Sequence, residues 1–81
     1  PVELSSEEVQ NYNMFLKILN FNKYSDIKKI MENLSSDFKY TSERNGSNYD
    51  LILGPLDKTE IKNLVSYFIS KGYKETKIII N

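Results

Sequence analysis

The apolar residues of this chain follow two different spacings in alternating blocks, and that order constrains the fold more than any other feature. Helical spacing occurs over residues 27–34 and again over residues 61–69. Short segments rich in β-favouring residues flank both blocks, at 15–21, 38–42, 49–53 and 76–80. The sequence therefore predicts the element order β-α-β-β-α-β.

Local signals predict where the helices and strands begin and end. Ser25 is expected to cap the first helix, and the polar residues 35–37 to end it. The second helix opens on a capping box of Asp57 and Glu60, and Gly72 lies where a left-handed residue closes a helix.

Two dipeptides predict how the strands turn and stop. Asn45-Gly46 predicts a hairpin turn, because both residues tolerate positive φ. Gly54-Pro55 is expected to end the third strand, since proline has no N–H to donate to a sheet.

These elements fit one small domain. Two helices with one apolar stripe each must cover one face of a four-stranded antiparallel sheet. This is an α+β, ferredoxin-like arrangement with the spatial strand order 4-1-3-2, and its second sheet face is open. Residues 14–81 form this domain. Residues 1–13 are either a linker or a short extra N-terminal helix.

Alternation along the strands predicts which side chains face the helices. On the first and third strands these are Leu16, Ile18, Leu51 and Leu53. The open face then carries Lys17, Leu19, Asp50 and Ile52. On the last strand, Ile78 and Ile80 are expected to point inward, with Lys77 and Ile79 outward.

Composition excludes several kinds of chemistry. The chain has no cysteine and no histidine, so it has no disulfide, no zinc site of the usual ligands and no thiol or imidazole catalyst. Asp50, Asp57 and Glu60 could in principle act as acid and base, but helix capping already explains Asp57 and Glu60. We therefore expect no enzymatic activity and no cofactor or metal.

Charge argues against a nucleic-acid partner. Eleven basic residues balance eleven acidic ones, whereas nucleic-acid binding usually needs a basic excess. An RNA-recognition module shares this element order and is the third hypothesis, although Asp50 would repel phosphate on its third strand. No apolar run is long enough to predict a membrane segment. A start at Pro1 suggests a domain of a larger protein.

Part of the sequence resembles a known family. The segment Leu53-Gly54-Pro55-Leu56, the helix after it, Gly72-Tyr73 and the isoleucine strand resemble the second half of a SPOR domain. Residues 16–21 and the first helix stripe occupy the places of its first half, so the resemblance covers residues 15–80. SPOR domains bind peptidoglycan glycan strands stripped of stem peptides. The resemblance implies a non-catalytic module that targets a bacterial envelope or division protein, in the periplasm or cell envelope.

The chain departs from the family pattern on the open face. Lys17 stands where the family often has glutamine, and Leu19 stands where it has glycine. Asp50 replaces an arginine of the family pattern, and Leu56 replaces an aromatic residue. Lys17 and Asp50 on adjacent strands would keep charge complementarity with its direction reversed. The expected ligand-binding residues are Lys17, Leu19, Asn20, Asn22, Tyr40, Asp50 and Ile52. For Asn20 and Asn22 the alternative is that they shape the strand-to-helix turn.

A second function remains open. The same fold could serve as a protein–protein interaction or dimerisation domain with sugar binding lost, burying Leu19, Ile52 and Ile79. The replacements at Lys17 and Asp50 favour this alternative.

Overall fold

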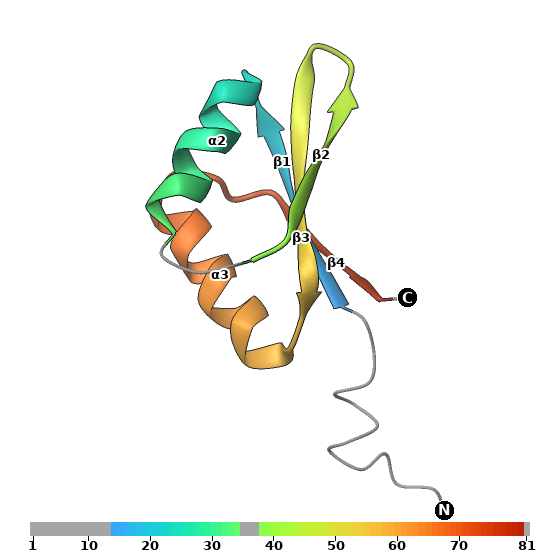
Figure 1. Ribbon diagram of the computed structural model, residues 1–81, viewed down its shortest axis with the longest axis vertical. Helices are drawn as coiled ribbons and strands as arrows, with labels where there is room; N and C mark the ends of the chain where they lie inside the picture. The colour runs from blue at the N-terminus through green and yellow to red at the C-terminus, as the bar shows by residue number, and fades with distance from the viewer. Residues whose placement is uncertain (1–13, 35–37, 81) are drawn as a thin grey trace, which may run out of the picture.

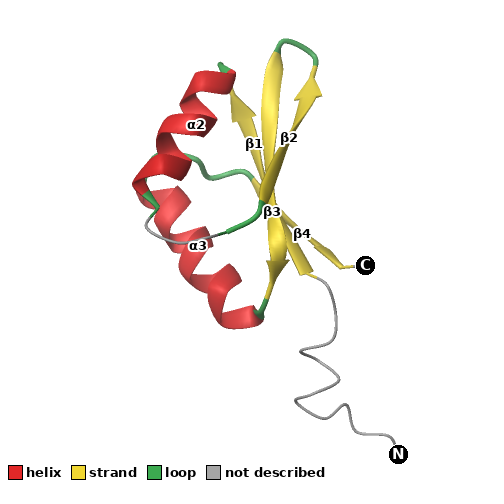
Figure 2. Cartoon of the chain, viewed as in Figure 1, coloured by secondary structure: helices red, strands yellow, loops and turns green. Residues whose placement is uncertain are grey.

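The computed structural model describes residues 14–34 and 38–80. Its elements are β1 (Met14–Phe21), α2 (Tyr24–Asn33), β2 (Tyr40–Asn45), β3 (Asn48–Leu56), α3 (Lys58–Ser70) and β4 (Thr76–Ile80). The four strands form one sheet in the order β2-β3-β1-β4, with all pairings antiparallel. Both helices lie on one side of this sheet (Figures 1 and 2). The predicted ferredoxin-like fold and strand order are confirmed, whereas the predicted linker or helix over 1–13 lies outside the described residues.

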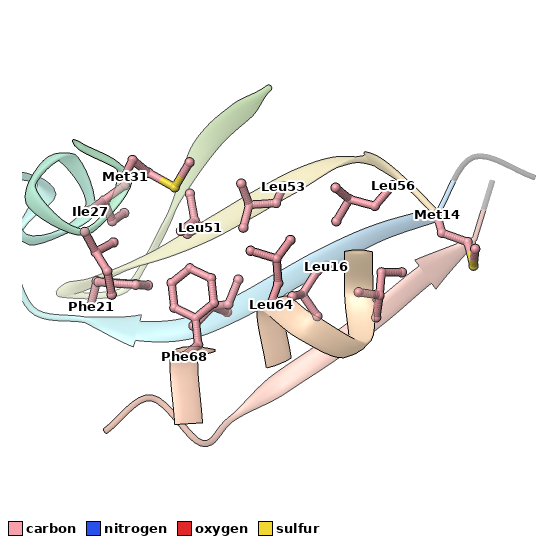
Figure 3. Packing of buried hydrophobic residues seen from close by; sticks show 13 residues of the cluster. Met14, Leu16, Phe21, Ile27, Met31, Leu51, Leu53, Leu56, Leu64 and Phe68 are labelled. Carbon is pink, nitrogen blue, oxygen red and sulfur yellow. The ribbon is translucent and has the colours of Figure 1, made fainter. Parts of the chain in front are cut away.

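The core lies between the helices and one face of the sheet. The four strand residues predicted to face the helices are fully buried: Leu16, Ile18, Leu51 and Leu53. Helix residues such as Ile27, Leu64 and Phe68 pack against them (Figure 3). Neither described helix covers the other face of the sheet (Figures 1 and 2).

Helix α3 has the ends that its sequence predicts. The Asp57 carboxylate accepts a hydrogen bond from the Glu60 N–H at 2.7 Å, and the Glu60 carboxylate accepts one from the Asp57 N–H at 2.9 Å. At the other end Gly72 has φ +97°, the Gly72 N–H donates to the Ile69 carbonyl and the Tyr73 N–H donates to that of Phe68. This is a Schellman motif, and it satisfies carbonyls that the helix leaves unpaired.

The predicted cap of the first helix is wrong. Helix α2 begins at Tyr24 with Lys23 as its N-cap, and no side chain caps it. Ser25 lies inside the first turn. The helix is held instead by its buried stripe of Ile27, Ile30 and Met31, which outweighs a missing cap bond of about 1 kcal/mol.

The hairpin forms where predicted, but its turn is one residue later. Strand β2 continues through Asn45, β3 begins at Asn48, and Gly46-Ser47 forms the two-residue loop. Gly46 has φ +64°. A positive φ at the first loop position alone is the pattern of a type II′ turn, which needs glycine only there.

Strand β3 does not stop at Gly54-Pro55, contrary to prediction. It continues to Leu56, which pairs with Met14 across a register shift in β1. The missing N–H of proline is tolerated at such an irregular position. The Gly54 N–H still donates to the Lys39 carbonyl at 3.0 Å.

The orientation predicted for β4 does not bury its isoleucines. Ile78 is 56% exposed and Ile80 is 61% exposed. Ile78 lies opposite the buried Leu16 and Ile80 opposite Met14, so both are on the helix side of the sheet. They remain exposed because β4 is an edge strand and the buried residues of α3 pack further in, over the core.

Candidate functional site

The sheet face away from the helices is the candidate site, and we call it the open face. Strand register places Lys17, Ile52 and Thr41 side by side across β1, β3 and β2, with Glu43 opposite Asp50. The face has two parts. The polar cluster consists of Lys17, Asn20, Glu43, Asn45 and Asp50. The depression, of about 220 Å³, is lined by Phe15, Lys39, Tyr40, Thr41, Ile52 and Gly54.

An irregularity in β1 organises the polar cluster. The pairing of β1 with β3 shifts register between Ile18 and Phe21, and Asn20 within this bulge has φ +70°. Asparagine tolerates this left-handed conformation better than most residues. The Asn20 N–H turns to a side chain instead of a strand and donates to Asp50 Oδ1 at 3.3 Å.

Asp50 is buried although it lies on the open face, with only 1% of the residue exposed. Besides the Asn20 N–H, its carboxylate accepts a hydrogen bond from Asn45 Nδ2 at 3.3 Å. Lys17 Nζ lies 3.8 Å from Oδ2. A buried carboxylate needs such partners to offset its desolvation. Asp50 therefore joins β1, β2 and β3 through its internal contacts.

Lys17 joins Asp50 to the edge strand. Its ammonium also lies 3.1 Å from Glu43 Oε1, and 21% of its side chain is exposed. The predicted Lys17–Asp50 complementarity is thus present as an ion pair. Glu43 was not among the predicted residues, because a turn at Asn45-Gly46 would place Thr41, not Glu43, opposite Asp50.

The two asparagines have different surroundings. The Asn20 side chain donates to the Glu75 carboxylate and accepts from Asn48 Nδ2 at 3.5 Å. It therefore joins β1 to the first residue of β3 and to the connection before β4. Asn22 is exposed in the short link between β1 and α2 and takes no part in the polar cluster.

The depression has a different composition. Phe15 and Ile52 provide its apolar surface, while Tyr40, Thr41 and Lys39 border it from the β2 side. The Phe15 ring lies over Gly54, so that a Cβ at Gly54 would be 2.6 Å from Phe15 Cδ2. The absence of a side chain at Gly54 thus allows the ring to approach the backbone of β3 closely. Sequence alternation could have identified Phe15, since it is two residues before Lys17.

A second hollow lies at the bulged end of the sheet, next to the polar cluster. It measures about 310 Å³ and is lined by Leu19, Asn20, Gly72, Tyr73, Lys74 and Glu75. The Tyr73 ring stacks on Phe21 with 4.2 Å between centroids. Burial, and secondly the Asp26 carboxylate, raise the pKa of Tyr73 above its ordinary value of 10.0, so its hydroxyl is protonated at neutral pH.

Of the predicted ligand residues, the structure brings Lys17, Leu19, Asp50 and Ile52 onto or beside the open face. Tyr40 borders the depression, but it lies opposite the buried Leu53, which places its side chain on the helix side of the sheet. Over residues 14–34 and 38–80, no three acidic side chains gather as a metal site. The arrangement can hold a ligand by contact with apolar surface, hydroxyls and ammonium groups.

Comparison with protein-family models, with curated proteins and with solved structures finds no match to the chain. Neither described helix is long and apolar enough to cross a membrane.

Proposed function

We propose that this domain is a non-catalytic module that binds peptidoglycan glycan strands lacking stem peptides, and that it targets a bacterial envelope or division protein. The observation that carries the proposal is the depression on the open face, together with the resemblance of residues 15–80 to SPOR domains. A strand-lined, shallow surface suits an extended polymer better than it suits a compact small molecule.

The chemistry of the depression matches that of such a glycan. Sugar rings present apolar C–H faces, which can lie on Phe15 and Ile52. Their hydroxyl and acetamido groups can bond the Thr41 hydroxyl, which lies beside Ile52. Removal of the stem peptide leaves a lactyl carboxylate, for which Lys39 supplies a cation.

The polar cluster has a supporting role in this proposal. Because Asp50 is buried and bonded within the protein, ligand contact falls to residues of the depression and to the exposed part of Lys17. The expected site is therefore centred on Phe15, Thr41 and Ile52, with Asp50 holding the strands in register.

The proposal is tested by co-sedimentation with purified sacculi. We expect the domain to pellet with sacculi treated with an amidase that removes stem peptides, and not with untreated sacculi. Lys39→Glu should reduce pelleting. Lys62→Glu, the same charge reversal at an exposed position on α3, is the control and should pellet like the wild type. Equal pelleting with both kinds of sacculi, or with neither, would contradict the proposal.

A dimer that buries the open face is the second candidate. The observation that favours it is the pairing of Lys17 with Glu43 and Asp50, because charges already paired lose less on desolvation than free ones. In this case Ile52→Lys would convert a dimer to a monomer in sedimentation velocity. A monomeric wild type would exclude it.

A further inference from the structure

Exposed aliphatic side chains gather at one edge of the sheet. Among the described residues, the large exposed aliphatic side chains are Ile69, Ile78, Ile79 and Ile80. Three belong to β4, the edge strand that follows β1 in the sheet order. Ile69 belongs to α3. Lys71 follows two residues later, so the two side chains point to opposite flanks of the helix, and Lys71 borders a hollow that α2 also lines. Ile69 therefore lies on the β4 side of the helix layer.

The backbone of β4 has a matching pattern. The Leu19 N–H donates to the Glu75 carbonyl at 2.9 Å, and the register continues as Ile18–Thr76, Lys17–Lys77 and Leu16–Ile78. Antiparallel strands alternate between residues that bond one neighbour and residues that bond the other. Glu75, Lys77 and Ile79 therefore direct their backbone groups to β1. Thr76, Ile78 and Ile80 direct theirs outward, where no described strand pairs with them.

Among residues 14–34 and 38–80, the β2 edge of the sheet carries protecting charges on its strand, and the β4 edge is not covered by another strand. Strand β2 carries Glu43 and Arg44 and is exposed at most positions, which is how proteins commonly prevent edge-to-edge pairing. Strand β4 has Lys77 as its only charged residue, and Lys77 lies opposite Lys17 on the open face. The outer side of β4 thus lacks the usual deterrent.

We propose that two copies of this chain associate through β4, paired antiparallel about a two-fold axis at Ile78. The outward-facing residues are symmetric about this point. Ile78 would exchange both backbone hydrogen bonds with Ile78 of the partner subunit, and Thr76 would do so with Ile80 of the partner subunit. A second copy thus supplies partners for the outward N–H and C=O groups of β4 in one register. This register places no like charges opposite one another.

Side chains and charge agree with this pairing. Directly opposed residues share a face, so Ile78 and Ile80 of both copies lie together on the helix side, next to Ile69. The chain has eleven basic and eleven acidic residues, so two copies have no net repulsion. The dimer leaves the open face uncovered, and the inference does not depend on the proposed function.

Sedimentation velocity over a range of concentrations tests the proposal. We expect the wild-type 81-residue chain to form a dimer. Ile78→Lys should weaken it at least about tenfold, because the axis opposes the two introduced charges. Asn63→Lys, which adds the same charge at an exposed position of α3, should leave it unchanged. Circular dichroism melts confirm that each variant is folded.

A second substitution distinguishes backbone pairing from simple apolar contact. Ile78→Pro removes an N–H that points outward and leaves the ladder with β1 intact, so a folded variant should be monomeric. Thr76→Pro, which removes another outward N–H at the first residue of β4, replaces it if Ile78→Pro does not fold. A wild type that stays monomeric at every concentration would overturn the proposal. So would a dimer that survives in the folded Ile78→Lys variant and in a folded proline variant, or one that is lost in Ile52→Lys alone.

Discussion

The polar cluster and the depression share the same three strands but differ in what their side chains contact. In the cluster, Lys17 pairs with both Asp50 and Glu43, and Asp50 also accepts the Asn20 N–H. In the depression, Phe15 and Ile52 meet the protein on one side and solvent on the other. The charged side chains of the open face are thus paired within the protein, whereas the apolar side chains of the depression are partly exposed to solvent. Charge alone is a poor guide to a binding site in this molecule.

This difference predicts that substitutions in the two halves separate stability from binding. Changes in the cluster should lower the free energy of unfolding. Changes at the β2 border of the depression should lower affinity for the glycan and leave folding almost unaffected. The following experiments take these expectations from the largest effect to the smallest.

Asp50→Ala should have the largest effect, lowering the free energy of unfolding by about 3 kcal/mol. It removes a buried acceptor from the Asn20 N–H and Asn45 Nδ2 and leaves Lys17 with one partner. Urea unfolding measures the loss. Glu43→Ala is the matched control, because its side chain is 58% exposed and should cost less than about 1 kcal/mol. Equal losses in the two variants would contradict a structural role specific to Asp50.

Gly54→Ala should lower the free energy of unfolding by about 2 kcal/mol. Gly54 has φ +148°, and a Cβ there would lie 2.6 Å from Phe15 Cδ2 and 2.8 Å from the Met14 carbonyl oxygen. Gly46→Ala is the control in a position with nothing within 4 Å of the added atom. Thermal melts compare the two, and a smaller loss at Gly54 than at Gly46 would argue against the Phe15 contact.

Thr41→Ala should reduce glycan binding about tenfold and change stability by less than about 0.5 kcal/mol. Thr41 is exposed, lies beside Ile52 on the open face and borders the depression. The two measurements are co-sedimentation with amidase-treated sacculi and a thermal melt. Full binding in the variant would remove Thr41 from the site, and a large loss of stability would remove the distinction between the two halves.

Lys17→Ala should have the smallest effect, at most about 1 kcal/mol of stability, because its ion pairs are partly exposed. It also decides to which half Lys17 belongs. Weaker glycan binding at an unchanged melting temperature would place Lys17 in the ligand site. A lower melting temperature with unchanged binding would place it with Asp50 in the structural cluster.

The sequence predicts most of the fold because local rules determine it. The Asp57–Glu60 capping box, the Gly72 closure and the alternation of Leu16 and Ile18 each depend on neighbours in the chain. The errors concern relations between elements. Burial of Ile78 depends on how far α3 reaches over an edge strand, and that is a property of the packed helix layer.

The candidate site was less predictable than the fold. Shifting the turn by one residue to Gly46-Ser47 changed the partner of Asp50 to Glu43. The bulge at Asn20 turned a predicted ligand residue into part of an internal network. Neither event has a strong signal in the sequence, because both depend on how two strands meet.

The pairing of Met14 with Ile80 has a mechanical consequence. The first described strand begins beside the point where the last one ends, so both leave the sheet at the same end (Figure 1). A pulling force applied through Met14 and Ile80 would load the β1–β4 ladder one residue pair at a time, as a zipper is opened. When two strands are pulled along their length, many hydrogen bonds between them must break together. In this geometry the hydrogen bonds between β1 and β4 would break one after another. As a tether under tension, the domain would therefore yield first at β4.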